Sequence, residues 1–228
     1  EADVKSGTSP ALRAALSKPV PIGDLPFRVY AAPFRAAGSH SSVLVSVEID
    51  GASLRFQERE GRFNERVEVS IIAADERARV QGEDRQEFDL RLQPDTYQRV
   101  RQTGVRLLSR LTLRPGRYHI QVGAHETSAG ATGTVAYDLE VPDYQRLPFG
   151  LSGLVLASSS GDALVTANPD PLLKETLGGS PAATRRFTTT ETLTVYAEAY
   201  DTSRQAHAIP FGTTVHNAMD GRKVFEST

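Results

Sequence analysis

The sequence predicts an all-β protein, in which a β-sandwich is followed by a second, smaller or incomplete β-sandwich unit, with one or two short helices. Two observations lead to this class. From Leu25 onward, apolar and polar residues alternate with a period of two, which is typical of strands that bury one face. Gly, Asp and Ser turn residues separate these stretches, and the long helical patterns of a parallel α/β sheet do not occur between them.

Length, composition and charge exclude several classes of protein. The chain has 228 residues, enough for one large domain or two modest ones, and a net charge of -2. That charge is too close to zero for a protein that wraps a polyphosphate, so nucleic acid is excluded as a partner. No apolar run is long enough to span a membrane. The chain has no cysteine, which excludes disulfides, thiolate metal sites and a cysteine nucleophile.

Residues 1–19 are predicted to form a polar lead-in followed by a short helix. Ser9 is placed to cap a helix over residues 11–17, with Pro10 at its first position, and two later prolines end it. The chain begins at Glu1 with no signal sequence before it, which is expected of a mature form or a fragment.

Alternation predicts strands along most of the remaining chain. They cover residues 27–32, 43–48, 67–72, 87–92, 105–113, 118–124, 134–141, 151–157, 193–200 and 213–217. Between two of them, Pro94 and Gly104 bracket a stretch with apolar residues three apart, which predicts a helical crossover between sheets.

Tyr118 is the best local marker of the fold. It follows the tight turn at Pro115 and Gly116 and begins a strand. In immunoglobulin-like sandwiches, a tyrosine in this place turns its hydroxyl back onto the preceding backbone and locks a corner between the sheets. The alternative is a tyrosine on an ordinary strand, with its hydroxyl in water. The first interpretation makes the sandwich immunoglobulin-like.

We place a domain boundary near residue 146. It separates a β-sandwich domain over residues 20–145 from a second β unit over residues 146–228. Residues 158–184 are rich in Ser, Gly, Pro, Asn and Asp, which predicts a long loop. The second unit carries fewer strand signals than the roughly seven of an immunoglobulin-type sandwich. It is therefore predicted to be incomplete, or small and dependent on the first.

No catalytic residue and no cofactor site are predicted. Ser152 stands in a Gly-Leu-Ser-Gly run, which lacks the Gly-x-Ser-x-Gly spacing of a nucleophile elbow. His125 and Glu126 resemble the opening of a zinc-protease helix, but no histidine follows one helical turn later. The histidines are scattered along the chain, at His40, His119, His125, His207 and His216.

Loop oxygens are the candidates for calcium, which extracellular β-sandwich modules often bind at one end. The candidates are Asn168, Asp170, Asp201, Asn217 and Asp220. None belongs to an Asp-x-Asp-x-Asp-Gly loop, residues 201–205 break the adhesion-site signature at its final serine, and Asp220 with Gly221 is explained as a hairpin turn. The sequence predicts no metal site and leaves open whether these loops bind calcium.

Six arginines lie close together in the sequence. They are Arg99, Arg101, Arg106, Arg110, Arg114 and Arg117. On a strand, three of them would share one face, so a basic stripe that binds an acidic polymer or the carboxylates of a partner is one interpretation. The other, which we favour, is a solvated face that pairs with nearby acids. These acids are Asp75, Glu76, Glu83, Asp84, Glu87 and Asp89.

Several stretches carry a family resemblance. They are residues 26–35, 43–51, 82–90, 107–118, 137–143 and 151–156. Through them the chain resembles, over roughly residues 9–157, the region C-terminal to the von Willebrand factor A-like domain in VWFA-related acidobacterial domain proteins. The resemblance implies a secreted or envelope-associated bacterial protein of unassigned function, with the A-like domain before Glu1. It rests on structural residues and transfers no functional residue to this chain.

These observations predict a non-catalytic interaction or scaffold module that supports adhesion or assembly in the cell envelope or outside the cell. Its partner is predicted to be a protein or its own N-terminal domain. An exposed sheet edge predicts homo-oligomers or strand pairing with a neighbouring chain. The alternative is a carbohydrate-binding or accessory module of a secreted hydrolase, although tryptophan is absent and aromatic residues make up only 7%. The ligand, the oligomeric state and the orientation of the two units stay open.

Overall fold

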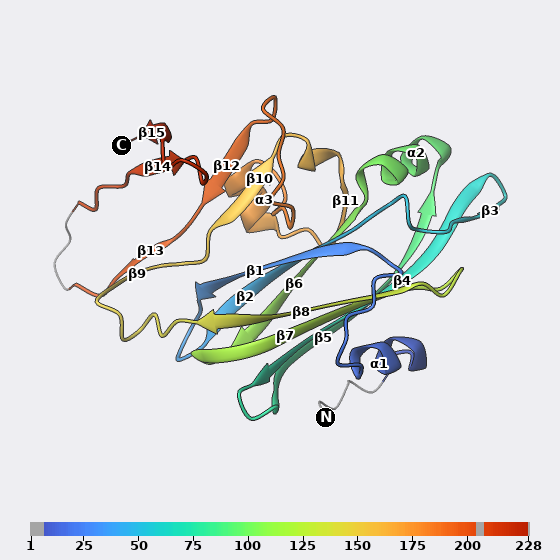
Figure 1. The fold of residues 1–228 in the computed structure, drawn as a ribbon, viewed down its shortest axis with the longest axis horizontal. Helices are drawn as coiled ribbons and strands as arrows, with labels where there is room; N and C mark the ends of the chain where they lie inside the picture. Colours follow the sequence, from blue (N-terminus) through green and yellow to red (C-terminus); the bar gives the residue numbers. More distant parts are fainter. Residues whose placement is uncertain (1–6, 204–207, 228) are drawn as a thin grey trace.

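The chain folds into a β-sandwich that carries a third layer on one side (Figure 1). This computed structural model describes residues 7–203 and 208–227, so residues 1–6 of the predicted lead-in and His207 lie outside the described part. Sheet 1 consists of β3 (Gln57–Arg59), β4 (Arg62–Asp75), β5 (Val80–Leu92), β7 (Gly116–Glu126) and β8 (Thr132–Val141). Sheet 2 consists of β1 (Phe27–Arg35), β2 (Ser41–Ile49), β6 (Val105–Leu113) and β11 (Val165–Ala167).

The main core lies between the two sheets. Val45 of β2, Val69 of β4 and Val122 of β7 are at most 1% exposed and belong to one apolar cluster. These are the positions that the period-two pattern assigns to the buried face, because successive side chains of a strand point to opposite sides. The predicted all-β sandwich is confirmed. The short strands β3 and β11 carry no such pattern and are not predicted.

Helix α1 (Pro10–Leu16) begins as the sequence predicts. The Ser9 side chain accepts a hydrogen bond from the backbone N–H of Leu12 at 3.3 Å, and so caps the first turn. Leu12 and Leu16 pack against Ile72 on the outer face of sheet 1. The helix therefore covers part of that face.

Helix α2 (Pro94–Thr103) is the predicted crossover, because it joins β5 of sheet 1 to β6 of sheet 2. It ends at Gly104, whose φ of 91° lies in the region that favours glycine. Within the described residues, no helix is long and apolar enough to cross a membrane.

Tyr118 forms the predicted corner. Its hydroxyl donates a hydrogen bond to the backbone oxygen of Arg114 at 2.8 Å, and the residue is buried. We expect Tyr118→Phe to lower the free energy of unfolding by about 1 kcal/mol, because it removes this hydrogen bond and keeps the ring. Urea unfolding measures the loss, and Tyr97→Phe is the control, since the described residues give the Tyr97 hydroxyl no hydrogen bond. An equal loss in both variants would contradict the corner.

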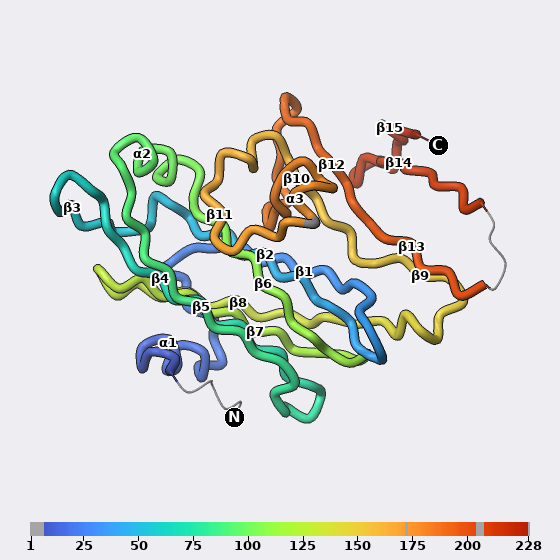
Figure 2. Tube along the Cα trace, turned by 180° about the vertical axis from the view of Figure 1, so that it is seen from behind, coloured from blue at the N-terminus to red at the C-terminus, as the bar shows by residue number. Residues whose placement is uncertain are grey.

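The third layer is a bent, two-stranded antiparallel ribbon. It pairs β9 (Phe149–Leu151) with β13 (Ala199–Asp201), and β10 (Val155–Ser158) with β12 (Leu193–Tyr196). Val155 clusters with Phe34 and Leu44 on the outer face of sheet 2. A Cβ atom at Gly153 would come within 2.8 Å of Ala32, so the ribbon backbone lies directly on β1. The ribbon and α1 lie on opposite sides of the sandwich (Figure 2).

Residues 158–184 are not the structureless loop that their composition predicts. They contain a 3-10 turn (Gly161–Ala163), strand β11, which pairs in parallel with β6, and a third helix, α3 (Pro171–Leu177). The signal for α3 is present in the sequence, because Asp170 caps the helix and Pro171 occupies its first position. Residues 7–203 and 208–227 therefore contain three α-helices, where one or two were predicted.

Candidate functional site

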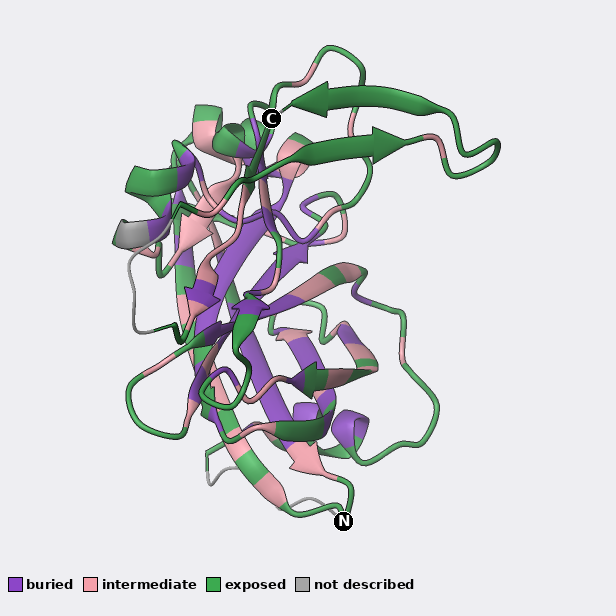
Figure 3. Cartoon of the chain, turned by 90° about the vertical axis from the view of Figure 1, so that its left-hand side faces the viewer, coloured by how far each residue is buried: buried purple, intermediate pink, exposed green. Residues whose placement is uncertain are grey.

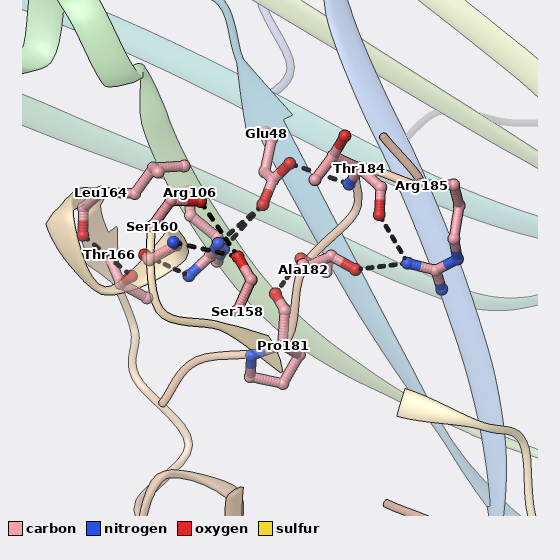
Figure 4. Close-up of polar contacts among 12 residues, drawn as sticks. Glu48, Arg106, Ser158, Ser160, Leu164, Thr166, Pro181, Ala182, Thr184 and Arg185 are labelled. Atoms are coloured by element: carbon pink, nitrogen blue, oxygen red, sulfur yellow. Dashed lines mark hydrogen bonds and ion pairs between the residues drawn. The ribbon is translucent and has the colours of Figure 1, made fainter. Parts of the chain in front are cut away.

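A buried polar cluster lies where the third layer covers sheet 2 (Figure 4). Glu48 of β2 and Arg106 of β6 are direct cross-strand partners. Two guanidinium nitrogens of Arg106, Nη2 and Nε, donate to one carboxylate oxygen of Glu48, at 2.7 and 3.0 Å. The exposed fractions of the two side chains are 1% for Arg106 and 8% for Glu48. This is a buried ion pair, which keeps its charges only if the remaining donors and acceptors are satisfied.

The backbone of residues 158–184 supplies those remaining partners (Figure 4). Arg106 Nη1 donates to the carbonyl of Gly161 at 3.2 Å, and the N–H of Thr184 donates to the second oxygen of Glu48 at 2.9 Å. Close by, the Ser46 hydroxyl donates to the carbonyl of Pro181 at 2.8 Å. Each guanidinium nitrogen of Arg106 and each carboxylate oxygen of Glu48 thus has a hydrogen-bond partner within the chain. The cluster, which we call the Glu48–Arg106 clamp, fastens the third layer to the sandwich.

A second buried cluster contains two carboxyl groups. Glu65 and Glu126 are 4% and 0% exposed, and the two carboxyl groups lie beside each other at one end of the core. One oxygen of Glu65 accepts from the N–H groups of Thr127 and Ser128, and one oxygen of Glu126 accepts from those of Ala129 and Ala131. The pair therefore holds the turn between β7 and β8.

Burial, with the charge of Glu65 beside it, raises the pKa of Glu126 above its ordinary value. The second oxygen of each carboxyl group has no hydrogen-bond partner among the described residues. One proton shared by the pair would supply the missing donor. Both of these oxygens are closed off from solvent.

The structure separates the arginines of the predicted stripe. Arg106 is buried in the clamp, Arg110 pairs with Asp170 of the third layer, and Arg101 donates to the backbone oxygen of Ala52. The prediction of a solvated face is wrong for Arg106, whereas Arg99, Arg110, Arg114 and Arg117 are exposed, and none of the six forms an ion pair with the nearby acids in the described part of the chain. Three of those acids, Asp75, Glu87 and Asp89, instead pair with arginines of sheet 1 or of its turns. The true partners lie far away in the sequence.

The residues considered for catalysis form hydrogen bonds with other parts of the chain. The Ser152 hydroxyl donates to the carbonyl of Gly153 and accepts from the N–H of Glu198, and no histidine takes part. The Glu198 carboxylate accepts from the hydroxyls of Tyr196 and Tyr200. His125 bonds the Thr132 hydroxyl at 2.8 Å. Among the other histidines, His119 contacts Asp138, His216 contacts Gly221, and His40 is half-buried.

The calcium candidates do not come together. Asp170 caps α3 and pairs with Arg110, and Asn168 donates to Gln86. Asp201 accepts from Ser203, Asn217 from the N–H of Met219, and Asp220 from the N–H of Arg222. Within residues 7–203 and 208–227, no group of three or more His, Asp or Glu side chains is arranged to hold a metal ion.

The C-terminal hairpin stands apart from these clusters. Its strands β14 (Thr213–His216) and β15 (Lys223–Ser227) pair only with each other in the described part of the chain. All of their described residues are exposed, including Val215, Val224 and Phe225 at 46%, 52% and 53% (Figure 3). An isolated two-stranded hairpin is marginally stable at best in water. The hairpin is therefore the part of the described structure that most needs a partner.

Comparisons with known proteins place no constraint on the function. No protein-family model matches the chain, and no curated protein matches it. Among solved structures, it is similar to a β-glucuronidase from glycoside hydrolase family 2, with a TM-score of 0.35 and 9% identity over 54% of this chain and 11% of that one. It is also similar to a protein described as a β-galactosidase from Bacteroides fragilis, with a TM-score of 0.33 and 20% identity over 50% of this chain and 16% of that one. The chain thus spans a small part of either protein.

Proposed function

We propose that this chain is a non-catalytic interaction module, which assembles with a second copy by strand pairing through the β14–β15 hairpin. The observation that carries the proposal is the exposure of both edges and both faces of that hairpin. Unpaired strand edges offer backbone N–H and C=O groups to another chain. The resemblance to the VWFA-related proteins supports a secreted or envelope location for this assembly.

The sequence of β15 complements itself. When two copies of Lys223-Val224-Phe225-Glu226 pair in antiparallel fashion about their centre, Lys223 stands opposite Glu226, and Val224 stands opposite Phe225. Opposite charges and paired apolar side chains at facing positions stabilise a sheet, whereas like charges destabilise it. In the single chain, Lys223 and Glu226 form an exposed ion pair with each other. Pairing of two copies replaces it with ion pairs between Lys223 of one copy and Glu226 of the other. This symmetry favours a closed dimer.

Charge reversal tests the pairing directly. We expect Lys223→Glu alone, or Glu226→Lys alone, to weaken dimerisation about tenfold, because each places like charges opposite each other twice. An equimolar mixture of the two variants is expected to dimerise like the parent chain, since each variant complements the other. Sedimentation equilibrium from low to high micromolar concentration measures all four samples.

Lys18→Glu is the matched control, because Lys18 is an exposed lysine that lies outside the hairpin. It is expected to leave dimerisation unchanged. A parent chain that stays monomeric at high micromolar concentration would contradict the proposal. So would single variants that dimerise like the parent, or a mixture that fails to recover.

A further inference from the structure

An arginine-rich groove lies on the outer face of sheet 1, at the end that α1 leaves uncovered. It has a volume of about 610 Å³ and lies between the β3–β4 hairpin, β5 and the turn that follows β7. Three of its lining residues are Arg59, Arg62 and Arg91, and polar side chains of Gln57, Asn64 and Ser128 lie beside them. We call Arg59, Arg62 and Arg91 the arginine triad.

The strand register brings the arginine triad together. Arg59 of β3 and Arg62 of β4 are direct cross-strand partners, and Arg91 of β5 stands opposite Asn64, two residues along β4 from Arg62. Facing residues on neighbouring strands have Cβ atoms about 4.5–5.5 Å apart, and diagonal neighbours lie about 7–8 Å apart. Three cations thus stand at neighbouring positions on one face of the sheet.

This arrangement breaks a rule of sheet stability. Like charges directly opposite each other destabilise a sheet, and in the described part of the chain none of the three arginines has an ion-pair partner. Arg66, on the same face, shows the contrast, because it pairs with both Glu87 and Asp89. Arg59 donates to the side-chain oxygen of Gln57 at 2.6 Å, but this neutral partner leaves the positive charge uncompensated. Facing arginines without a neutralising carboxylate mark a position kept for function.

We propose that the arginine triad binds an anionic polysaccharide, with its carboxylate or sulfate groups on the guanidinium forks. Planar guanidinium groups match such oxyanions with two parallel hydrogen bonds. The amide nitrogen of Gln57, the amide oxygen of Asn64 and the hydroxyl of Ser128, which the hydrogen bonds within the chain leave over, would meet sugar hydroxyls. Glu60 and Asp89 border the triad, so the groove suits spaced charges and repels a dense phosphate backbone. The hairpin of the proposed dimer takes no part in this site.

Isothermal titration of the full chain tests this site with oligogalacturonate, a heparin-derived oligosaccharide and a neutral cello-oligosaccharide. We expect one or both anionic probes to bind, and the neutral one not to bind. The variant R59Q/R62Q/R91Q is expected to lose at least about tenfold in affinity. The control R77Q/R99Q/R117Q removes three exposed arginines outside the groove, for the same change in net charge, and is expected to lose less than about twofold.

The two anionic probes distinguish uronate from sulfate as the recognised group. The groove variant is expected to melt at the temperature of the parent or above it, since it relieves like-charge repulsion, and this shows that it folds. Absence of binding by both anionic probes would overturn the proposal. An equal loss in the two triple variants, or tighter binding of a single-stranded oligonucleotide, would overturn it as well.

Discussion

Arg106→Met is expected to lower the free energy of unfolding by about 3–5 kcal/mol, because it leaves the buried carboxylate of Glu48 without its cation. Methionine keeps much of the length and packing of the arginine stem, so the loss reports the broken ion pair rather than a cavity. Urea unfolding followed by circular dichroism measures the change. The carbonyl of Gly161 also loses its donor, which adds to the loss.

Arg110→Met is the matched control for this prediction. Arg110 lies on the same strand and the same face as Arg106, but its side chain is 38% exposed in its ion pair with Asp170. Such a pair contributes less than about 1 kcal/mol, so the control is expected to lose little. The double variant Glu48→Met with Arg106→Met is expected to recover part of the loss, because it removes the stranded charge. Equal losses for Arg106→Met and Arg110→Met would refute the clamp.

Glu126→Gln is expected to stabilise the protein at neutral pH by about 1–2 kcal/mol. The amide oxygen would still accept from the N–H groups of Ala129 and Ala131, and the new amide nitrogen would donate to the unpartnered oxygen of Glu65. The substitution thus supplies the donor that a shared proton provides in the parent chain. Thermal unfolding over a series of pH values is the measurement.

The pH dependence follows from the raised pKa of Glu126. A carboxyl group whose pKa is raised by folding binds its proton more tightly in the folded state. Its contribution to stability is full below the unfolded pKa and is lost as the pH rises through the folded pKa. Glutamine stays neutral at every pH. The stability that Glu126→Gln gains over the parent chain is therefore expected to grow with rising pH and to vanish at acidic pH.

Glu68→Gln is the control, because its effect on the stability of the protein is expected to have the opposite sign to that of Glu126→Gln. Burial opposes ionisation of Glu68, but hydrogen bonds from Ser9 and Arg85 outweigh it and lower the pKa of Glu68. That carboxylate stabilises the fold above its unfolded pKa, and the contribution is lost as the pH falls through the folded pKa. Glu68→Gln is therefore expected to destabilise at neutral pH. If Glu126→Gln also destabilises there, the shared proton is refuted.

Local patterns in the sequence predict the sandwich and two helices correctly. A strand that buries one face must alternate, and a helix that begins with Ser9 and Pro10 carries its cap in the neighbouring residues. The Tyr118 corner is equally local, because its hydroxyl reaches a carbonyl only four residues back. Each of these features is set by residues that are close together in the chain.

Features that depend on distant partners are not predicted. Arg106 is expected on a solvated face, because nothing near it in the sequence reveals Glu48 or the cover of residues 158–184. The arginine triad joins three strands through their register, which composition does not show. Glu126 sits beside a histidine in the sequence, yet its strand turns it into the core towards Glu65. Pairing between strands decides each of these cases.

The parallel pairing of β11 with β6 also affects how the chain is made. During translation, β1, β2 and β6 leave the ribosome well before the segment that completes their sheet. Until β10 and α3 emerge as well, Phe34 and Leu44 lack their apolar cover, and Glu48 and Arg106 lack the backbone partners that residues 158–184 supply. Such an intermediate is a natural client for a chaperone, and premature termination after residue 145 would leave it permanently in that state.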